Sequence, residues 1–411
     1  MTERNTYFHK VKPFVDTDLV KVLVGMRRVG KSVLLGQIAD YLKELGVPED
    51  HILYYNFEQI QNASFCTAPS LHQEITRRIK AIPSPSEGRR KFYLFFDEIQ
   101  EVNQWEKCIN SFRLDFDCDI YITGSNSRLL SGELATYLAG RYVRIQVFPF
   151  SLAEFIQSCN ENPHLQDRST AALFQRYLES GGMPFVSAIQ TMPDSCLRYL
   201  QDIFNSVILK DIIQRNRIRD ADLLERVIVY TLLNISHTFS SSSLAKYFKS
   251  ESRRVSNETI MNYLSFCGQA FLFHKIPRME ISTKRLLTVN EKYYVADHSF
   301  ATAIYGSKAN SIDQILENLV CVEALRRDYE VKVGKVGDRE IDFVLERGGE
   351  RIYVQVCYLL ASPETTEREF GVYRHVHDNF PKYVVSLDEF DMGRDGIRHH
   401  HLRDFLLLEQ W

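Results

Sequence analysis

The sequence predicts an α/β protein with a parallel-sheet domain first, a helical middle and a second, smaller α/β domain last. Two observations predict the first domain. Residues 21–35 read as a short buried strand, a glycine-containing loop and a helix with apolar side chains at helical spacing. Residues 92–96 form a continuous apolar run, which is typical of a central strand covered on both faces. The 411 residues suggest about two to four domains in all.

The loop after the first strand spells G-x-x-x-x-G-K-S from Gly25 to Ser32. Its two glycines let backbone N–H groups face inward, beside the positive end of a helix, so that the loop binds phosphate oxygens. The Lys31 ammonium reaches the β and γ phosphates, and the Ser32 hydroxyl binds Mg²⁺. A chance glycine turn is the alternative, but the flanking strand and helix disfavour it. We predict nucleotide binding by Gly25, Arg28, Val29, Gly30, Lys31, Ser32 and Val33.

Two acidic residues follow the apolar run, at the tip of the predicted third strand. We expect Asp97 to hold Mg²⁺ and Glu98 to orient the attacking water. An acidic turn after a strand is common, so this interpretation depends on the glycine loop upstream. Asn56 falls near the end of the predicted second strand, residues 51–57, where ligand-facing residues of a parallel sheet lie.

A fourth strand, residues 119–122, ends in the polar sequence T-G-S-N-S. Ser125 and Asn126 are candidates for sensing the γ phosphate, with a solvated turn as the alternative. Arg141 precedes a fifth strand, residues 142–147. It is a candidate arginine finger for a neighbouring subunit, which requires a homo-oligomer; the alternative is a surface ion pair.

The segments GMRRVGKS, LFFDEIQEVNQW, YITGSNSRLL, LAGR, FPFSLAEF and YLESGGMP, in this order, resemble the bacterial and archaeal AAA-superfamily ATPases. The resemblance covers nearly the whole chain, although the carboxyl half of that group is poorly characterised. It implies ATP and Mg²⁺ as cofactors and ATP hydrolysis as the reaction. It also implies catalytic roles for Glu98, Lys31, Arg141 and Ser125, and metal binding by Ser32 and Asp97.

The middle of the chain predicts a long helix at 197–213, then three helices at 223–235, 243–248 and 255–267. Two strands, 271–276 and 292–295, follow with a turn at 278–288 between them. Three helices and a hairpin form the winged-helix pattern, which often sets its third helix in the DNA major groove. Plain connectors and protein docks share this pattern, so duplex DNA and a protein partner both stay open. The candidate DNA-facing residues are Arg253, Arg254, Asn257, Asn262, Lys284 and Arg285.

The last part of the chain resembles the PD-D/E-x-K nuclease superfamily in a helix glutamate, Glu317, and a strand aspartate, Asp342. That chemistry needs Mg²⁺ held by several carboxylates and a lysine that activates water. The expected glutamate and lysine are replaced by Gln355 and Cys357, and nothing in the sequence brings Lys382 to the site. We therefore predict a nuclease-like fold that has lost its active site.

These patterns divide the chain into an AAA-type ATPase domain (1–150), a helical connector (151–220), a winged-helix-like domain (221–298) and a nuclease-like domain (299–411). The net charge of −3 excludes a polycation, and the eight cysteines lack a C-x-x-C pair. No signal peptide and no apolar run of about 18 residues is visible, so we expect a cytoplasmic protein without membrane contact.

Two uses of ATP hydrolysis compete at this point. In one, hydrolysis rearranges a DNA-bound assembly; in the other, the protein is a nucleotide switch that docks a protein partner. An active nuclease is the third, less favoured interpretation.

Overall fold

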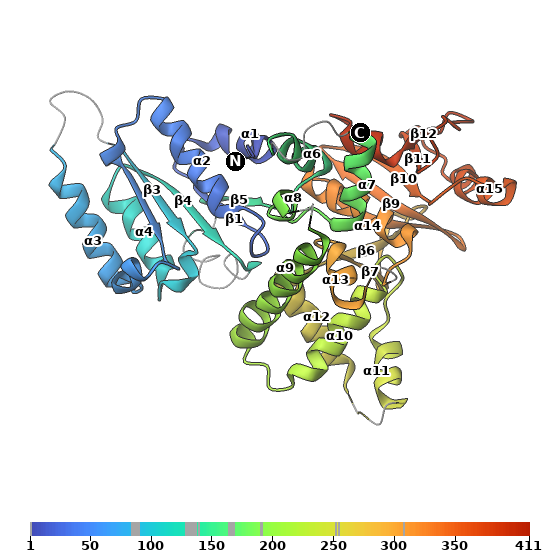
Figure 1. The fold of residues 1–411 in the computed structure, drawn as a ribbon, viewed down its shortest axis with the longest axis horizontal. Coiled ribbons are helices and arrows are strands. Elements are labelled where there is room, and N and C mark those ends of the chain that lie inside the picture. The colour runs from blue at the N-terminus through green and yellow to red at the C-terminus, as the bar shows by residue number, and fades with distance from the viewer. Residues whose placement is uncertain are drawn as a thin grey trace. The chain divides into compact units, whose positions relative to one another are not determined.

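The computed structural model describes residues 2–83, 91–127, 138, 140–162, 169–189, 192–250, 253, 255–306 and 309–411. The chain divides into two compact units (Figure 1). Unit 1 comprises Met1–Val147 with Gln269–Phe271, and unit 2 comprises Phe148–Gly268 with Leu272–Trp411.

Unit 1 contains a five-stranded parallel sheet in the order β2-β3-β4-β1-β5. Every residue of β3 is buried, as predicted for a central strand. The strand after the acidic one, β4, lies directly beside it, so their polar carboxyl-terminal tips are neighbours. The strands are β1 (Val20–Val24), β2 (Ile52–Asn56), β3 (Phe92–Asp97), β4 (Cys118–Gly124) and β5 (Tyr142–Gln146).

Helices cover both faces of this sheet. Helix α2 leads from β1 outward to β2, whereas α3 and α4 lead back across the sheet toward β4. Because parallel crossovers are right-handed, α2 lies on one face and α3 and α4 lie on the other (Figure 1). The helices are α1 (Asn5–Val11), which packs on α2 (Lys31–Glu44), and α3 (Ala68–Ala81), which packs on α4 (Trp105–Asp115). Short 3₁₀ helices span Lys12–Phe14, Glu49–His51, Ile60–Phe65 and Ile99–Glu101.

Unit 2 contains a seven-stranded mixed sheet in the order β12-β11-β10-β9-β8-β6-β7. Successive side chains point to opposite faces, so Phe343 and Val354 enter one core while Val344 and Tyr353 enter another. The strands are β6 (Phe273–Glu280), β7 (Arg285–Val295), β8 (Glu330–Val336), β9 (Arg339–Arg347), β10 (Glu350–Val356), β11 (Lys382–Ser386) and β12 (Arg398–His401).

Helices α6 to α12 of unit 2 precede the first strand of this sheet, α13 to α15 lie between its strands, and α16 follows the last strand. They are α6 (Leu152–Asn160), α7 (Thr170–Ser180), α8 (Val186–Ile189), α9 (Pro193–Ser206), α10 (Ala221–Leu233), α11 (Ser241–Ser250), α12 (Asn257–Gln269), α13 (Ser299–Tyr305), α14 (Ile312–Arg326), α15 (Pro363–Gly371) and α16 (Leu402–Leu407), with a 3₁₀ helix at Val372–His375. The predicted long helix at 197–213 is α9 continued by a π-helix, Val207–Gln214.

The predicted turn at 278–288 is wrong in extent. Strands β6 and β7 pair as far as Glu280 with Arg285, so the turn is confined to 281–284. β6 continues because its other edge pairs in parallel with β8. The hairpin is therefore part of the same sheet as the carboxyl-terminal strands, and this sheet crosses the predicted boundary between 221–298 and 299–411. The four-part division stays a prediction.

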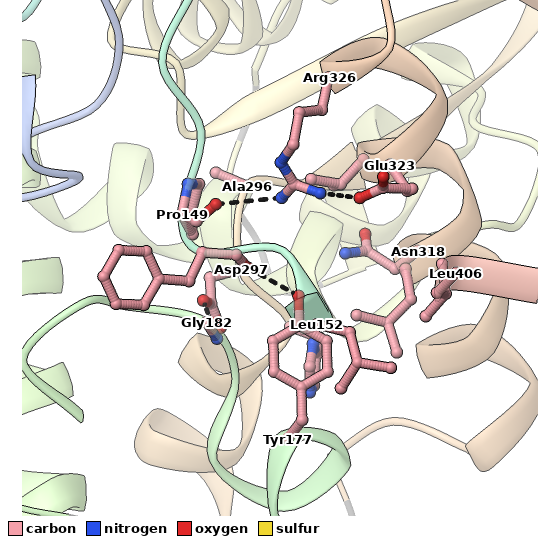
Figure 2. A pocket seen from close by; sticks show the side chains of 14 residues that line it. Pro149, Leu152, Tyr177, Gly182, Ala296, Asp297, Asn318, Glu323, Arg326 and Leu406 are labelled. Carbon is pink, nitrogen blue, oxygen red and sulfur yellow. Dashed lines mark hydrogen bonds and ion pairs between the residues drawn. The ribbon is translucent and has the colours of Figure 1, made fainter. Parts of the chain in front are cut away.

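The segments FPFSLAEF and YLESGGMP meet where unit 2 begins (Figure 2). The Phe150 N–H donates to the Gly182 carbonyl at 2.6 Å, and the Tyr177 hydroxyl donates to the Phe150 carbonyl at 2.8 Å. Arg326 donates to the Pro149 carbonyl at 3.0 Å. The cavity that these residues line has a volume of about 10 Å³, enough for about one water molecule. These hydrogen bonds hold the two segments together at the start of unit 2, which indicates a structural role for both.

Within the part of the chain that the structure describes, no helix combines the length and apolar character needed to cross a membrane.

Candidate nucleotide-binding site

The glycine loop lies between the carboxyl end of β1 and the first turn of α2. Gly25 has φ 154°, and a Cβ at this position would overlap the Val147 carbonyl oxygen. Gly30 has φ 93° and caps the amino end of α2. Arg28 is exposed with φ 63°, and Val29 is buried beneath the loop. Only glycine adopts the Gly25 conformation without a clash, which explains its place in the motif.

Lys31 lies inside the loop and is buried. Its Nζ donates to the carbonyl oxygens of Gly25 and Met26, both at 3.0 Å, and lies 3.7 Å from Glu98 Oε1. The ammonium therefore fills the concave side of the loop and faces a carboxylate of the neighbouring strand.

Asp97 is fully buried at the end of β3, and both of its carboxylate oxygens are held. The Thr123 hydroxyl donates to Oδ1 at 2.6 Å, and Asn56 Nδ2 donates to Oδ2 at 2.9 Å. Burial raises the pKa of Asp97, although hydrogen bonds from Thr123 and Ser32 oppose the shift. The structure thus brings together Ser32 and Asp97, the two predicted Mg²⁺ ligands.

Glu98 follows in the left-handed conformation, with φ 54°. Its N–H donates to Thr123 Oγ1 at 2.8 Å, and its carboxylate accepts a hydrogen bond from Gln100. Burial acts to raise the pKa of Glu98, but the Lys31 charge and hydrogen bonds from Gln100 and Ser125 lower it overall. Glu98 is therefore an ionised carboxylate beside the loop, and Ser125 is its neighbour as the order of strands predicts.

Arg141 lies away from Lys31, Asp97 and Glu98. It is exposed and precedes Tyr142, which pairs with Val20 at the start of β1. The glycine loop follows the other end of β1, so roughly 15 Å of strand separates the two. A role of Arg141 within its own subunit is not supported by this placement, and its role in a neighbouring subunit stays a prediction.

Sequence reasoning missed three residues of the site. Thr123 and Gln100 bind the two carboxylates, and a polar residue at a strand tip was an available signal for Thr123. The third is Arg4, which is buried and donates to the Val29 carbonyl at 2.5 Å. Nothing in the sequence around Arg4 indicates this contact.

A groove of about 650 Å³ runs from the glycine loop along α2. Its lining includes Arg4, Phe8, Ser32, Val33, Gly36 and Tyr41.

A second constellation of charged side chains lies in unit 2. The ammonium of Lys292, on β7, lies 2.7 Å from Glu340, 3.4 Å from Glu317 and 3.9 Å from Asp342. The Tyr294 hydroxyl also donates to Glu317, at 3.2 Å. Lys292 and Glu340 were not predicted as members of this group; a lysine inside the apolar strand sequence KYYV was the available signal for the first.

Burial and mutual repulsion perturb these acids. Burial raises the pKa of Glu317 to about 7, and it raises the pKa of Asp342, with the Glu317 charge adding to the effect. Burial acts to lower the pKa of Lys292, but Glu317, Asp342 and Glu340 raise it overall, so the lysine is charged.

The positions that depart from the nuclease pattern have structural partners. Gln355 Oε1 accepts from the Asp342 N–H at 3.2 Å, and Cys357 is buried with its pKa raised by burial. Lys382 does not reach the cluster, because it donates to the carbonyl oxygens of Asp378 and Phe380. Among the residues that the structure describes, no group of three or more His, Cys, Asp or Glu side chains is arranged to hold a metal ion.

The candidate DNA-facing residues are only partly available for contact. Arg253 pairs with Asp222 at 2.6 Å, and Arg254 lies outside the described residues. The exposed candidates are Asn257, Asn262, Lys284 and Arg285.

The strand order, the glycine loop and the acidic strand tip define the class of protein, a P-loop ATPase of the AAA type. Residues 17–156 match the family model described as an AAA domain, and residues 171–311 match a domain of unknown function, DUF8612. The prediction of an AAA-type domain is confirmed, while the winged-helix and nuclease-like assignments stay predictions.

The particular family is that of an uncharacterized protein of Haemophilus influenzae. The two sequences are 38% identical over 99% of each chain, and our chain belongs to its family. Uncharacterized protein MJ1544 of Methanocaldococcus jannaschii is 29% identical over 92% of this chain and 83% of its own. Among solved structures, the Walker-type ATPase PABY2304 of Pyrococcus abyssi matches with a TM-score of 0.50 and 16% identity, over 74% of this chain and 96% of that one.

Proposed function

We propose that unit 1 binds ATP with Mg²⁺ and hydrolyses its terminal phosphoanhydride bond. The observation that carries the proposal is the gathering of Lys31, Ser32, Asp97 and Glu98 where the glycine loop meets the tip of β3. An ammonium, a hydroxyl and two carboxylates at this place are the groups that phosphoryl transfer to water requires.

The donor set fits Mg²⁺. Ser32 and Asp97 would hold the ion through oxygen atoms, which Mg²⁺ prefers, together with phosphate oxygens of the substrate. Asp97 is fully buried and its pKa is raised by burial, so a cation beside it favours its charged form. When bound, Mg²⁺ offsets the negative charge that develops on the phosphates.

The chain supplies the remaining steps. Backbone N–H groups of the loop bind the phosphate oxygens, and Lys31 exchanges the carbonyls of Gly25 and Met26 for the β and γ phosphates. Glu98, ionised and close to Lys31, accepts a hydrogen bond from the attacking water and aligns it. The groove that starts at Ser32 and Val33 has room for the nucleoside part of ATP.

Calorimetric titration of the full chain with ATP and Mg²⁺, followed by measurement of phosphate release, tests this proposal. We expect saturable heat and steady turnover. An absence of both, on folded protein, would overturn it.

The use of hydrolysis has two candidates in unit 2. The exposed Asn257, Asn262, Lys284 and Arg285 support a DNA-coupled ATPase. The pairing of Arg253 with Asp222 counts against contact of this arginine with a DNA phosphate. A nucleotide switch that docks a protein is the alternative. Turnover stimulated by duplex DNA, with affinity that falls steeply in salt, supports the first. Turnover indifferent to DNA, with an oligomer size that depends on nucleotide, supports the second.

Nuclease activity has less support. The Lys292 ammonium lies beside Glu317 and Asp342, the two carboxylates of the nuclease pattern, where its charge would repel a Mg²⁺ ion. Gln355 is a weaker Mg²⁺ ligand than a carboxylate. We expect no nicking of supercoiled plasmid with Mg²⁺ or Mn²⁺, and nicking that is lost in Asp342→Asn would reverse this conclusion.

A further inference from the structure

Thr123 touches both acidic residues of the candidate site. It lies on β4, paired with Leu23 of β1 and beside the end of β3, and it is fully buried. Its Oγ1 lies 2.6 Å from Asp97 Oδ1 and 2.8 Å from the backbone nitrogen of Glu98. A single hydroxyl therefore bridges the two groups expected to hold the metal and to align the water.

The direction of both hydrogen bonds follows from the chemistry of the atoms. A backbone N–H can only donate, so Thr123 Oγ1 is the acceptor for Glu98. The hydroxyl then has its one hydrogen for Asp97, which as a carboxylate can only accept. A threonine satisfies both partners at once, and neither a valine nor an alanine does.

The two bonds act on different properties. Asn56 holds Oδ2 of Asp97, and the hydrogen bond from Thr123 holds Oδ1. Together they fix the orientation of the carboxylate and therefore the direction of the lone pairs that remain for a metal ion. The bond to the Glu98 N–H holds the peptide that precedes a residue in the left-handed conformation, at φ 54°. Non-glycine residues adopt this conformation at a cost in free energy, so a fixed partner is needed to maintain it.

We propose that Thr123 is a positioning residue for ATP hydrolysis, which holds Asp97 for the metal and Glu98 for the attacking water through one hydroxyl. This inference rests on the proposed ATPase function. Thr123 is distinct from Ser125 and Asn126, because it contacts the carboxylates from within the sheet.

The test is Thr123→Val, which keeps the size and branching of the side chain and removes both hydrogen bonds. We expect ATP affinity measured without Mg²⁺ to change less than about threefold, because the glycine loop is untouched. The Mg²⁺ concentration for half-maximal rate rises by about tenfold or more, and kcat falls by about a hundredfold.

Two further variants separate positioning from folding. Thr123→Ser restores the hydroxyl and should recover most of kcat and of the Mg²⁺ response. Thr76→Val is the matched control: its hydroxyl, on α3, is buried without a hydrogen-bond partner among the described residues, so neither parameter should change.

The outcomes are distinct. If wild-type protein hydrolyses ATP and Thr123→Val keeps its kcat and Mg²⁺ response, the inference is overturned while the ATPase proposal stands. If wild-type protein neither binds nor hydrolyses ATP, the proposed function itself fails. Should Thr123→Val not fold, Thr123→Ala, which also removes both hydrogen bonds of the hydroxyl, replaces it in the same measurements. An unchanged Mg²⁺ response there would also overturn the inference.

Discussion

Replacing Lys292 by methionine removes an ammonium that lies among three carboxylates while keeping a long apolar side chain. Lys292 is buried, and its Nζ lies 2.7, 3.4 and 3.9 Å from Glu340, Glu317 and Asp342. Breaking a buried ion pair by removing one partner costs about 3–5 kcal/mol. Glu317 and Asp342 lose their cation in this variant, whereas Glu340 keeps its pair with Arg278 at 3.0 Å. For a unit of this size, that loss corresponds to a melting temperature lower by about 10 °C or more.

The destabilisation by Lys292→Met should depend on pH with a defined sign. Without the ammonium, the pKa values of Glu317 and Asp342 in the folded state rise further above their unfolded values. The folded variant then binds protons that the unfolded chain releases, so its stability falls as pH rises. Because the pKa of Glu317 in the wild-type protein is already raised to about 7, both folded proteins bind this proton at pH 5, and the additional loss in the variant develops as pH rises through about 7. The loss of stability relative to wild type is therefore larger at pH 8 than at pH 5.

The assay follows the fluorescence of one tryptophan during thermal unfolding. The chain has two tryptophans, and Trp411 in unit 2 stacks on Phe405 at a centroid distance of 4.4 Å. In a Trp105→Phe background, Trp411 alone reports the unfolding of unit 2. The control is Lys275→Met on β6, whose lysine is 49% exposed and pairs with Glu291 at 2.6 Å. An exposed pair contributes about 0–1 kcal/mol.

The reasoning would be refuted if Lys292→Met and Lys275→Met unfolded at the same temperature. It would also be refuted if the loss of stability in Lys292→Met were the same at pH 5 and pH 8. Either result would mean that the carboxylates are compensated by other groups.

Three shorter predictions concern unit 1. Lys31→Ala should abolish measurable ATP binding in calorimetry, whereas Lys43→Ala, at the exposed end of the same helix, should bind normally; unchanged binding in Lys31→Ala would count against the site. Glu98→Gln should keep ATP affinity and lower the hydrolysis rate by at least about a hundredfold, and normal turnover would place the water-aligning group elsewhere. Arg141→Ala should lower turnover only if subunits complete each other's sites; the check is activity against protein concentration beside native mass, and full activity in an oligomer would remove Arg141 from the site.

Local sequence was sufficient for the nucleotide site because its parts are short and contiguous. A strand, a glycine loop and a helix follow one another within residues 20–44, and each has its own signal. The acidic pair at 97–98 follows directly from a strand that is buried at every residue. A parallel sheet then places the carboxyl ends of its strands at one edge, so the meeting of Lys31 with Asp97 and Glu98 could be predicted.

Contacts between residues that lie far apart in the sequence could not be predicted from local patterns. Thr123 reaches Asp97 across 26 positions of sequence, and Arg4 reaches Val29 across 25. The extent of the hairpin was wrong because β6 is extended by pairing with β8, and a pairing partner 50 or more residues away leaves no local signal.

The sequence by itself determined the class of the first domain, its strand–loop–helix motif and the residues expected to bind phosphate and metal. Only the tertiary structure decided which side chains surround the two acidic groups, and that a lysine of β7 lies among the carboxylates of α14 and β9. The physical reason is that a backbone motif is specified by neighbouring residues, whereas the environment of a buried charge is specified by strand pairing between distant ones.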